Sequence, residues 1–146
     1  MGKQMTDNPI EWRMHLTVPP GKVYDLLNSG KGRASFWAES AEEVDGGIDF
    51  EFINGQCYRS MILEREYPRK FSLIYFGGTA TFELSGDGRG GTDLQLRHEG
   101  VPSGEWIEVH AGWLNVLFPL KAQLIYGVDL RNHDPSRTWD QGYADQ

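Results

Sequence analysis

Two polar side chains stand inside the longest apolar segment of the chain, which reads EWIEVHAGWLNVLFPLKAQLIYG from residue 105 to 127. His110 has Trp106 one turn before it and Trp113 one turn after it, so helical geometry would place all three on one face. Because imidazole titrates near neutral pH, His110 could bond a ligand or move a proton if that face borders a cavity. In a closed core it would be a structural histidine bonded to a carbonyl or a carboxylate, and both interpretations stay open.

Lys121 falls on nearly the same helical angle about three turns later. Pro119 lies between the two positions and lacks a backbone N–H, so we expect a kink there. Burying an unpaired ammonium is costly, so Lys121 should either extend past the helix end or meet a carboxylate or an anionic ligand head group. We favour the first arrangement.

His98 is the third candidate, and it belongs to a strand pattern. It continues Leu94 and Leu96 at alternate positions, so the three side chains should point the same way. If that face of the sheet is concave, His98 enters the cavity, where Glu64 and Tyr75 could be polar neighbours. A histidine and a carboxylate of unknown geometry do not make a catalytic pair, so no catalytic residue is assigned and His110 and His98 remain the candidates.

The sequence gives little support for a dinucleotide, nucleophile, metal or disulfide site. The stretch GDGRGG, residues 86–91, satisfies G-x-G-x-x-G, but the segment TDLQLRHE after it alternates as a strand where a dinucleotide site needs a helix, so we expect a hairpin loop. The chain contains no G-x-S-x-G, H-E-x-x-H or P-loop pattern. Its single cysteine, Cys57, can form neither an internal disulfide nor a zinc site with the Cys/His spacings present. We therefore expect no cofactor and no metal.

The elements that must position these residues follow from local patterns. Residues 10–18 alternate as a half-buried strand, and residues 19–30 and 31–37 suggest two short helices. Five further strand patterns separated by turn residues then form an antiparallel meander: 48–53, 57–66, 70–76, 79–85 and 92–99. In the final helix Glu105, Glu108, Asn115 and Gln123 share one narrow arc while apolar residues cover the rest, which predicts an α+β domain whose sheet wraps around that helix.

The segments FWAESAEEVDGGIDFEF, GGTDLQLRHEGVP and HAGWLNVLFPL carry a family resemblance. In order and spacing over roughly residues 10–127, they resemble homologues of the activator of the 90-kDa heat-shock protein ATPase, within the START and birch-pollen-allergen (SRPBCC) superfamily. The resemblance implies a helix-grip fold, in which a curved antiparallel sheet grips a long C-terminal helix, with two short helices after the first strand and a hydrophobic cavity between sheet and helix. We expect a flexible N-terminus (1–9), the helix-grip domain (10–127) and a polar C-terminal tail (128–146) that is extended or mobile. The acidic groups of this tail should be solvated, although Trp139 and Tyr143 could dock on the domain.

Large apolar groups and a few polar ones are expected around this cavity. The predicted ligand-binding residues are Phe36, Trp37, Phe50, Phe52, Tyr75, Phe82, His98, Trp106, His110, Trp113, Leu117 and Lys121. Such a lining suits a small apolar or aromatic ligand.

Composition limits the partners. The 146 residues suit one domain, and 21 acidic against 14 basic residues give a net charge of −7, which disfavours nucleic acid and anionic membranes. The N-terminus has no signal-peptide pattern and no apolar run is long enough to span a membrane, so we expect a cytoplasmic protein. Met1-Gly2 followed by Thr6 matches a short myristoylation pattern, which we interpret as chance.

Three functions stay open at this point. The leading hypothesis is a carrier, sensor or stress-related protein that binds a small apolar ligand. The second is an enzyme of the polyketide cyclase or hydrolase kind using His110 or His98 in the same cavity. The third is a co-chaperone-type interaction module, and a homodimer is a further open alternative.

Overall fold

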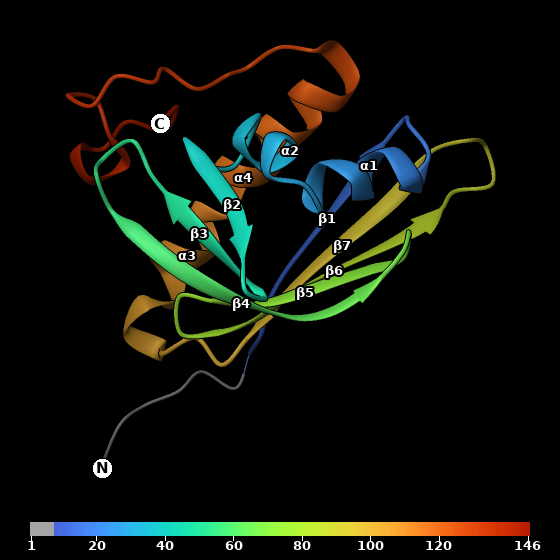
Figure 1. Cartoon of the computed structure of the whole chain (residues 1–146), viewed down its shortest axis with the longest axis horizontal. Helices are drawn as coiled ribbons and strands as arrows, with labels where there is room; N and C mark the ends of the chain where they lie inside the picture. The colour runs from blue at the N-terminus through green and yellow to red at the C-terminus, as the bar shows by residue number, and fades with distance from the viewer. Residues whose placement is uncertain (1–7) are drawn as a thin grey trace.

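The computed structural model describes residues 8–146, which form one curved antiparallel sheet packed against helices (Figure 1). The expected flexible N-terminus and the Met1-to-Thr6 pattern lie outside the described residues, apart from residues 8 and 9. The seven strands are β1 (Ile10–Leu16), β2 (Ser40–Val44), β3 (Gly47–Glu51), β4 (Cys57–Glu66), β5 (Lys70–Tyr75), β6 (Gly78–Gly86) and β7 (Thr92–Glu99).

The strands follow the order β1-β7-β6-β5-β4-β3-β2, so the first two strands of the chain form opposite edges of the sheet. The helices α1 (Pro20–Leu27) and α2 (Gly30–Ala34) carry the chain from one edge to the other. A shift of register between Ile62 and Glu64 marks a bulge in β4, and such bulges bend a sheet. The GDGRGG motif forms the loop between the antiparallel strands β6 and β7, as predicted.

The strand β2 is absent from the sequence-based expectation, which placed only a helix before Gly46-Gly47. Ala41 is its only buried residue, and Glu42, Glu43 and Val44 are exposed. A short edge strand whose two apolar residues do not alternate gives no clear pattern, and its pairing with β3 through the turn at Asp45 and Gly46 is what defines it.

The long C-terminal helix is built from consecutive segments rather than from one uninterrupted α-helix. They are the 3-10 turn η1 (Ser103–Glu105), α3 (Trp106–Gly112), α4 (Leu114–Lys121) and the π-helical turn η2 (Ala122–Tyr126). Pro119 lies inside α4 and cannot donate to the carbonyl of Asn115, and the helix widens into η2 soon after it. Gly127, with φ 65°, ends the helix in the left-handed conformation that glycine adopts readily.

The core lies between the concave face of the sheet and this helix. Trp113, Leu117 and Leu120 are at most 2% exposed and belong to the same buried cluster as Phe71 and Phe82 of the sheet. Full burial of each leucine side chain contributes roughly 1.5–3 kcal/mol, so the helix is held mainly by its packing against the sheet.

The C-terminal tail lies against the domain, and it has no helix or strand over residues 128–138. Residues 128–146 run from the end of the C-terminal helix toward the hairpin between β3 and β4 (Figure 1). They contain the 3-10 turn η3 (Trp139–Gln141) and the buried side chains of Arg131 and Thr138. The tail is held by hydrogen bonds to the domain, from Arg131 to the carbonyls of Ala38 and Ala34.

Candidate functional site

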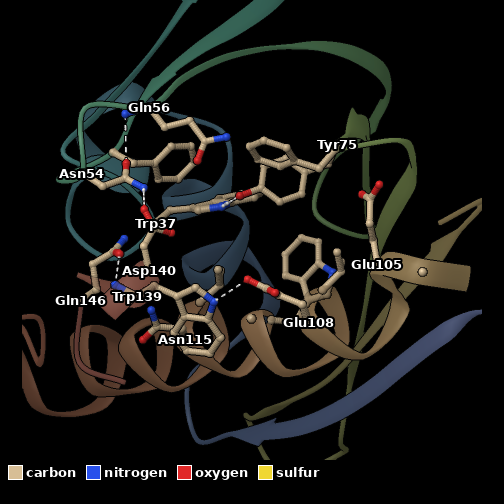
Figure 2. A pocket seen from close by; sticks show the side chains of 17 residues that line it. Trp37, Asn54, Gln56, Tyr75, Glu105, Glu108, Asn115, Trp139, Asp140 and Gln146 are labelled. Atoms are coloured by element: carbon tan, nitrogen blue, oxygen red, sulfur yellow. Dashed lines mark hydrogen bonds between the residues drawn. The ribbon is translucent and has the colours of Figure 1, made fainter. Parts of the chain in front are cut away.

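A pocket of about 440 Å³ opens on the concave side of the sheet, where five parts of the chain meet (Figure 2). They are the segment between α2 and β2, the β3–β4 turn, the β5–β6 hairpin, the C-terminal helix and the C-terminal tail. The lining residues are Trp37, Phe52, Asn54, Gln56, Tyr75, Phe76, Gly104, Glu105, Glu108, Val109, Gly112, Trp113, Asn115, Val116, Trp139, Asp140 and Gln146.

The inner wall of the pocket is a set of aromatic rings that hold one another in place. The ring centroid of Tyr75 lies 5.5 Å from that of Trp37 and 5.1 Å from that of Trp113, and the two indoles are 5.9 Å apart. The indole N–H of Trp37 donates to the hydroxyl of Tyr75 at 3.0 Å. This wall is therefore rigid before any ligand arrives, which lowers the entropy cost of binding.

The hydroxyl of Tyr75 has a hydrogen left to give. The oxygen accepts from Trp37, and among the hydrogen bonds of residues 8–146 none is donated by this hydroxyl. The residue is only 8% exposed, and burial raises the pKa of the phenol well above its ordinary value of 10.0. Tyr75 is consequently a neutral, buried donor in the inner wall of the pocket.

The β5–β6 hairpin positions the next ring. Phe76 and Gly77 form a two-residue turn with φ of 38° and 86°, and a left-handed conformation is costly for a side chain as large as phenylalanine. Stacking against Tyr58, with centroids 4.1 Å apart, compensates and directs the Phe76 ring to the pocket. The wall thus contains a backbone strain that the surrounding rings support.

The rim of the pocket is acidic. Glu105 and Glu108 reach it from the C-terminal helix, and Asp140 reaches it from the tail. Glu108 accepts from the indole N–H of Trp139 at 3.3 Å, and Asp140 accepts from the side-chain amide of Asn54 at 3.0 Å. None of the 17 lining residues is a lysine, arginine or histidine.

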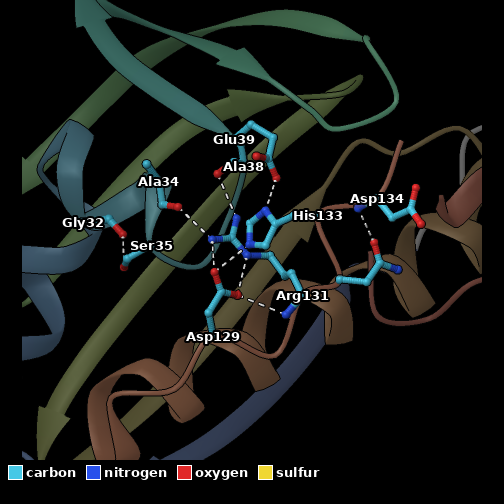
Figure 3. Close-up of polar contacts among 10 residues, drawn as sticks. Gly32, Ala34, Ser35, Ala38, Glu39, Asp129, Arg131, His133 and Asp134 are labelled. Atoms are coloured by element: carbon cyan, nitrogen blue, oxygen red, sulfur yellow. Dashed lines mark hydrogen bonds and ion pairs between the residues drawn. The ribbon is translucent and has the colours of Figure 1, made fainter. Parts of the chain in front are cut away.

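A buried arginine holds the tail that supplies the outer wall (Figure 3). The guanidinium of Arg131, whose side chain is 5% exposed, donates to the carbonyls of Ala38 and Ala34, each at 2.8 Å. It also pairs with both carboxylate oxygens of Asp129, each at 2.9 Å. His133 bridges the carboxylates of Asp129 and Glu39 at 2.7 and 2.6 Å, which ties the tail to the start of β2.

The charges around Arg131 shift the pKa values of Asp129 and His133. Burial raises the pKa of Asp129, but the hydrogen bonds from Arg131 and His133 outweigh it and hold that pKa well below its ordinary value of 3.8. The carboxylate of Asp129, helped by Glu39, raises the pKa of His133 above 6.5, against the opposing effects of burial and of Arg131. The imidazole therefore gains a proton more readily here than in an unfolded chain.

The structure brings together part of the predicted ligand-binding set. Trp37, Phe52, Tyr75 and Trp113 line the pocket. The residues that lie behind this wall, in the closed core, are Phe36, Phe50, Phe82 and Leu117. The side chains that lie elsewhere and do not border the pocket are His98, Trp106, His110 and Lys121.

His98 points the same way as Leu94 and Leu96, as predicted, but both of its ring nitrogens are occupied inside the core. Nδ1 accepts from the indole N–H of Trp113 at 2.9 Å, so Nε2 carries the hydrogen and donates to the carbonyl of Tyr75 at 2.8 Å. Burial lowers the pKa of this imidazole despite the hydrogen bond to Tyr75, and the neutral ring holds the aromatic wall in register.

His110 faces the edge strand β1. Its ring stacks between Trp12, at a centroid distance of 4.5 Å, and Trp106, at 4.6 Å. Lys121 reaches the same strand further along, where its ammonium donates to the exposed backbone carbonyl of His15 at 3.2 Å. Neither head group reaches the ligand pocket.

Sequence reasoning missed the acidic rim and the tail. The narrow polar arc of Glu105, Glu108 and Asn115 was visible in the sequence, and it borders the pocket rather than only the solvent. Trp139, for which docking on the domain was an open alternative, was the other available signal and also borders the pocket. In residues 8–146 no group of three or more His, Cys, Asp or Glu side chains is arranged to hold a metal ion. Across the same residues, no helix has the length and apolar character that crossing a membrane requires.

Known proteins resemble this chain in fold rather than in sequence. No family model matches this chain, and no curated protein does. Among solved structures, the Aha1 dimer from Colwellia psychrerythraea is similar with a TM-score of 0.74 and 19% identity, over 82% of this chain and 98% of that one. DynU16, from the dynemicin biosynthetic locus, has a TM-score of 0.74 and 16% identity, over 85% of this chain and 49% of that one. CalU16 from Micromonospora echinospora has a TM-score of 0.64 and 20% identity, over 86% and 84%.

These likenesses, together with the seven-stranded curved sheet and the long C-terminal helix, define the class of the domain. It has the helix-grip fold, as the sequence predicted. Since this fold serves unrelated functions, the activity must be argued from the pocket.

Proposed function

We propose that this protein binds a small, largely apolar or aromatic ligand in the pocket between the sheet, the C-terminal helix and the tail, as a carrier or sensor. The observation that supports the proposal is the pocket itself, about 440 Å³ in volume and walled by pre-positioned aromatic rings with a few polar groups at its edge. Both its size and its lining are typical of sites for small molecules.

The geometry favours binding over catalysis. The histidines that were candidates for proton transfer, His98 and His110, do not border the pocket, and both ring nitrogens of His98 are engaged in the core. The enzyme alternative would need its acid or base among the rim carboxylates, and nothing in their arrangement pairs them with a nucleophile. A ligand carrier or sensor is the simpler function for such a site.

Gly112 offers a direct test. It borders the pocket from α3, and a Cβ added there would meet no atom within 4 Å. The variant Gly112→Leu should fill part of the pocket without a clash, whereas Gly112→Ala should leave most of it open; both raise helix propensity. Native mass spectrometry after incubation with a panel of lipids and aromatic metabolites should show ligand retained by the wild type and by Gly112→Ala, and lost from Gly112→Leu. Equal retention by all three, or no retention by any, would overturn the proposal.

We also infer that this protein is an Aha1-like member of the START and birch-pollen-allergen superfamily and that it acts in the cytoplasm. The resemblance of the segments around Phe36, Leu94 and Trp113 supports the first point, and the single, exposed Cys57 suits a reducing compartment.

The similar Aha1 structure is that of a dimer, and here the outer side of the C-terminal helix exposes Ile107 (78%) and Phe118 (54%) at helical spacing. Sedimentation equilibrium should show a homodimer that Phe118→Asp weakens; a monomer at all concentrations would exclude it.

A further inference from the structure

The rim carboxylates of the pocket lack cationic partners. Elsewhere in residues 8–146 many acidic side chains are paired with arginine, as Glu43 is with Arg65 at 2.8 Å. Glu105, Glu108 and Asp140 belong to none of the ion pairs formed by the described residues, and the donors to the last two are a neutral indole and a neutral amide. In a protein of net charge −7, the pocket entrance therefore carries a negative potential.

The inner wall has two features that restrict the class of ligand that fits the pocket. The indole rings of Trp37, Trp113 and Trp139 line the pocket, and the faces of aromatic rings attract cations through their quadrupole. Tyr75 is more than nine-tenths buried, and its hydroxyl keeps one hydrogen to donate, so the inner end of the pocket suits a neutral acceptor such as a carbonyl or ether oxygen.

We propose that the ligand is an aromatic or apolar amine, bound with its ring system against Trp37 and Trp113, an acceptor atom toward Tyr75 and its ammonium at the rim formed by Glu105, Glu108 and Asp140. This inference rests on the proposed binding function and specifies its ligand class. An anionic ligand such as a fatty acid is disfavoured because its carboxylate would face like charges with no lysine, arginine or histidine in the lining to offset them.

Three probes of nearly equal shape separate charge from apolar contact: naphthalenemethylamine, naphthalenemethanol and naphthoate, which are a cation, a neutral molecule and an anion at pH 7. Binding is measured by isothermal titration calorimetry at low ionic strength. Because the rim is partly exposed to solvent, we expect the amine to bind about fivefold more tightly than the alcohol, with the naphthoate weakest. Added salt should reduce the difference between the amine and the alcohol.

Matched variants then test the rim. Glu108→Gln keeps an acceptor for the indole N–H of Trp139 but removes the charge, and we expect it to cut the preference for the amine about threefold. Glu83→Gln removes an exposed charge from β6, outside the pocket lining, and should leave that preference unchanged. If the alcohol binds as tightly as the amine, the cation inference fails while the binding function stands; if none of the three binds, both fail.

Discussion

Arg131 holds the C-terminal tail against the domain, and the strength of this attachment can be tested by substitution. Replacing Arg131 by methionine keeps an unbranched side chain but removes the guanidinium, which bonds the carbonyls of Ala34 and Ala38 and both oxygens of Asp129. Removing one partner of a buried ion pair costs 3–5 kcal/mol, and the 37% exposure of the Asp129 side chain places this case near about 3 kcal/mol. Because the tail can detach without unfolding the sheet, this free energy should appear as a roughly hundredfold rise in the population with an undocked tail.

Hydrogen exchange measures this opening directly. The amides of Asn132 and Tyr143, which donate to the carbonyls of Asp145 and Thr138, should exchange much faster in Arg131→Met, while those of β6 and β7 should not change. The matched control is Arg137→Met, which breaks an Arg–Asp pair of the same tail whose arginine is 56% exposed, and its effect should be small. Unchanged protection of the tail in folded Arg131→Met would refute the view that this buried pair docks it.

Two further predictions concern the same structure. For His133, the folded-state pKa is raised above 6.5, so its contribution to tail docking is complete below that pH and lost as the pH rises through the folded pKa. Tail protection in the wild type should therefore be constant below pH 6.5 and fall as the pH rises above it, and it should stay flat in His133→Gln; a fall in both proteins would assign it to other groups. For Tyr75, the change to phenylalanine leaves the buried indole N–H of Trp37 without its acceptor and should lower the free energy of unfolding by about 1–3 kcal/mol in urea titrations. An unchanged midpoint would mean that water or another group accepts this hydrogen bond.

Strand and helix patterns predicted most of the fold. The bounds of β4 and β7 match the alternation of residues 57–66 and 92–99, because each strand has one face toward the core. The same argument placed His98 beside Leu94 and Leu96. It could not find β2, in which Ala41 is the only buried residue, because that strand is defined by hydrogen bonds to its neighbour.

The candidate site was predicted less completely. Trp37, Phe52, Tyr75 and Trp113 were expected at the cavity and border the pocket, whereas Phe36, Phe50, Phe82 and Leu117 are closed into the core behind them. All eight are large apolar groups on the correct faces of their elements. Which of them meets empty space depends on how neighbouring rings fill the volume, and periodicity carries no information about that.

The sequence by itself determined that an antiparallel sheet would enclose an apolar C-terminal helix, because the spacing of apolar residues decides which face of each element avoids water. Only the tertiary structure decided what His98 and His110 contact and how the pocket is completed. The tail returns across the domain because Arg131 finds carbonyls at Ala34 and Ala38, almost one hundred residues earlier in the chain. That return places Trp139 and Asp140 opposite Glu108, and such long-range hydrogen bonds leave no local pattern in the sequence.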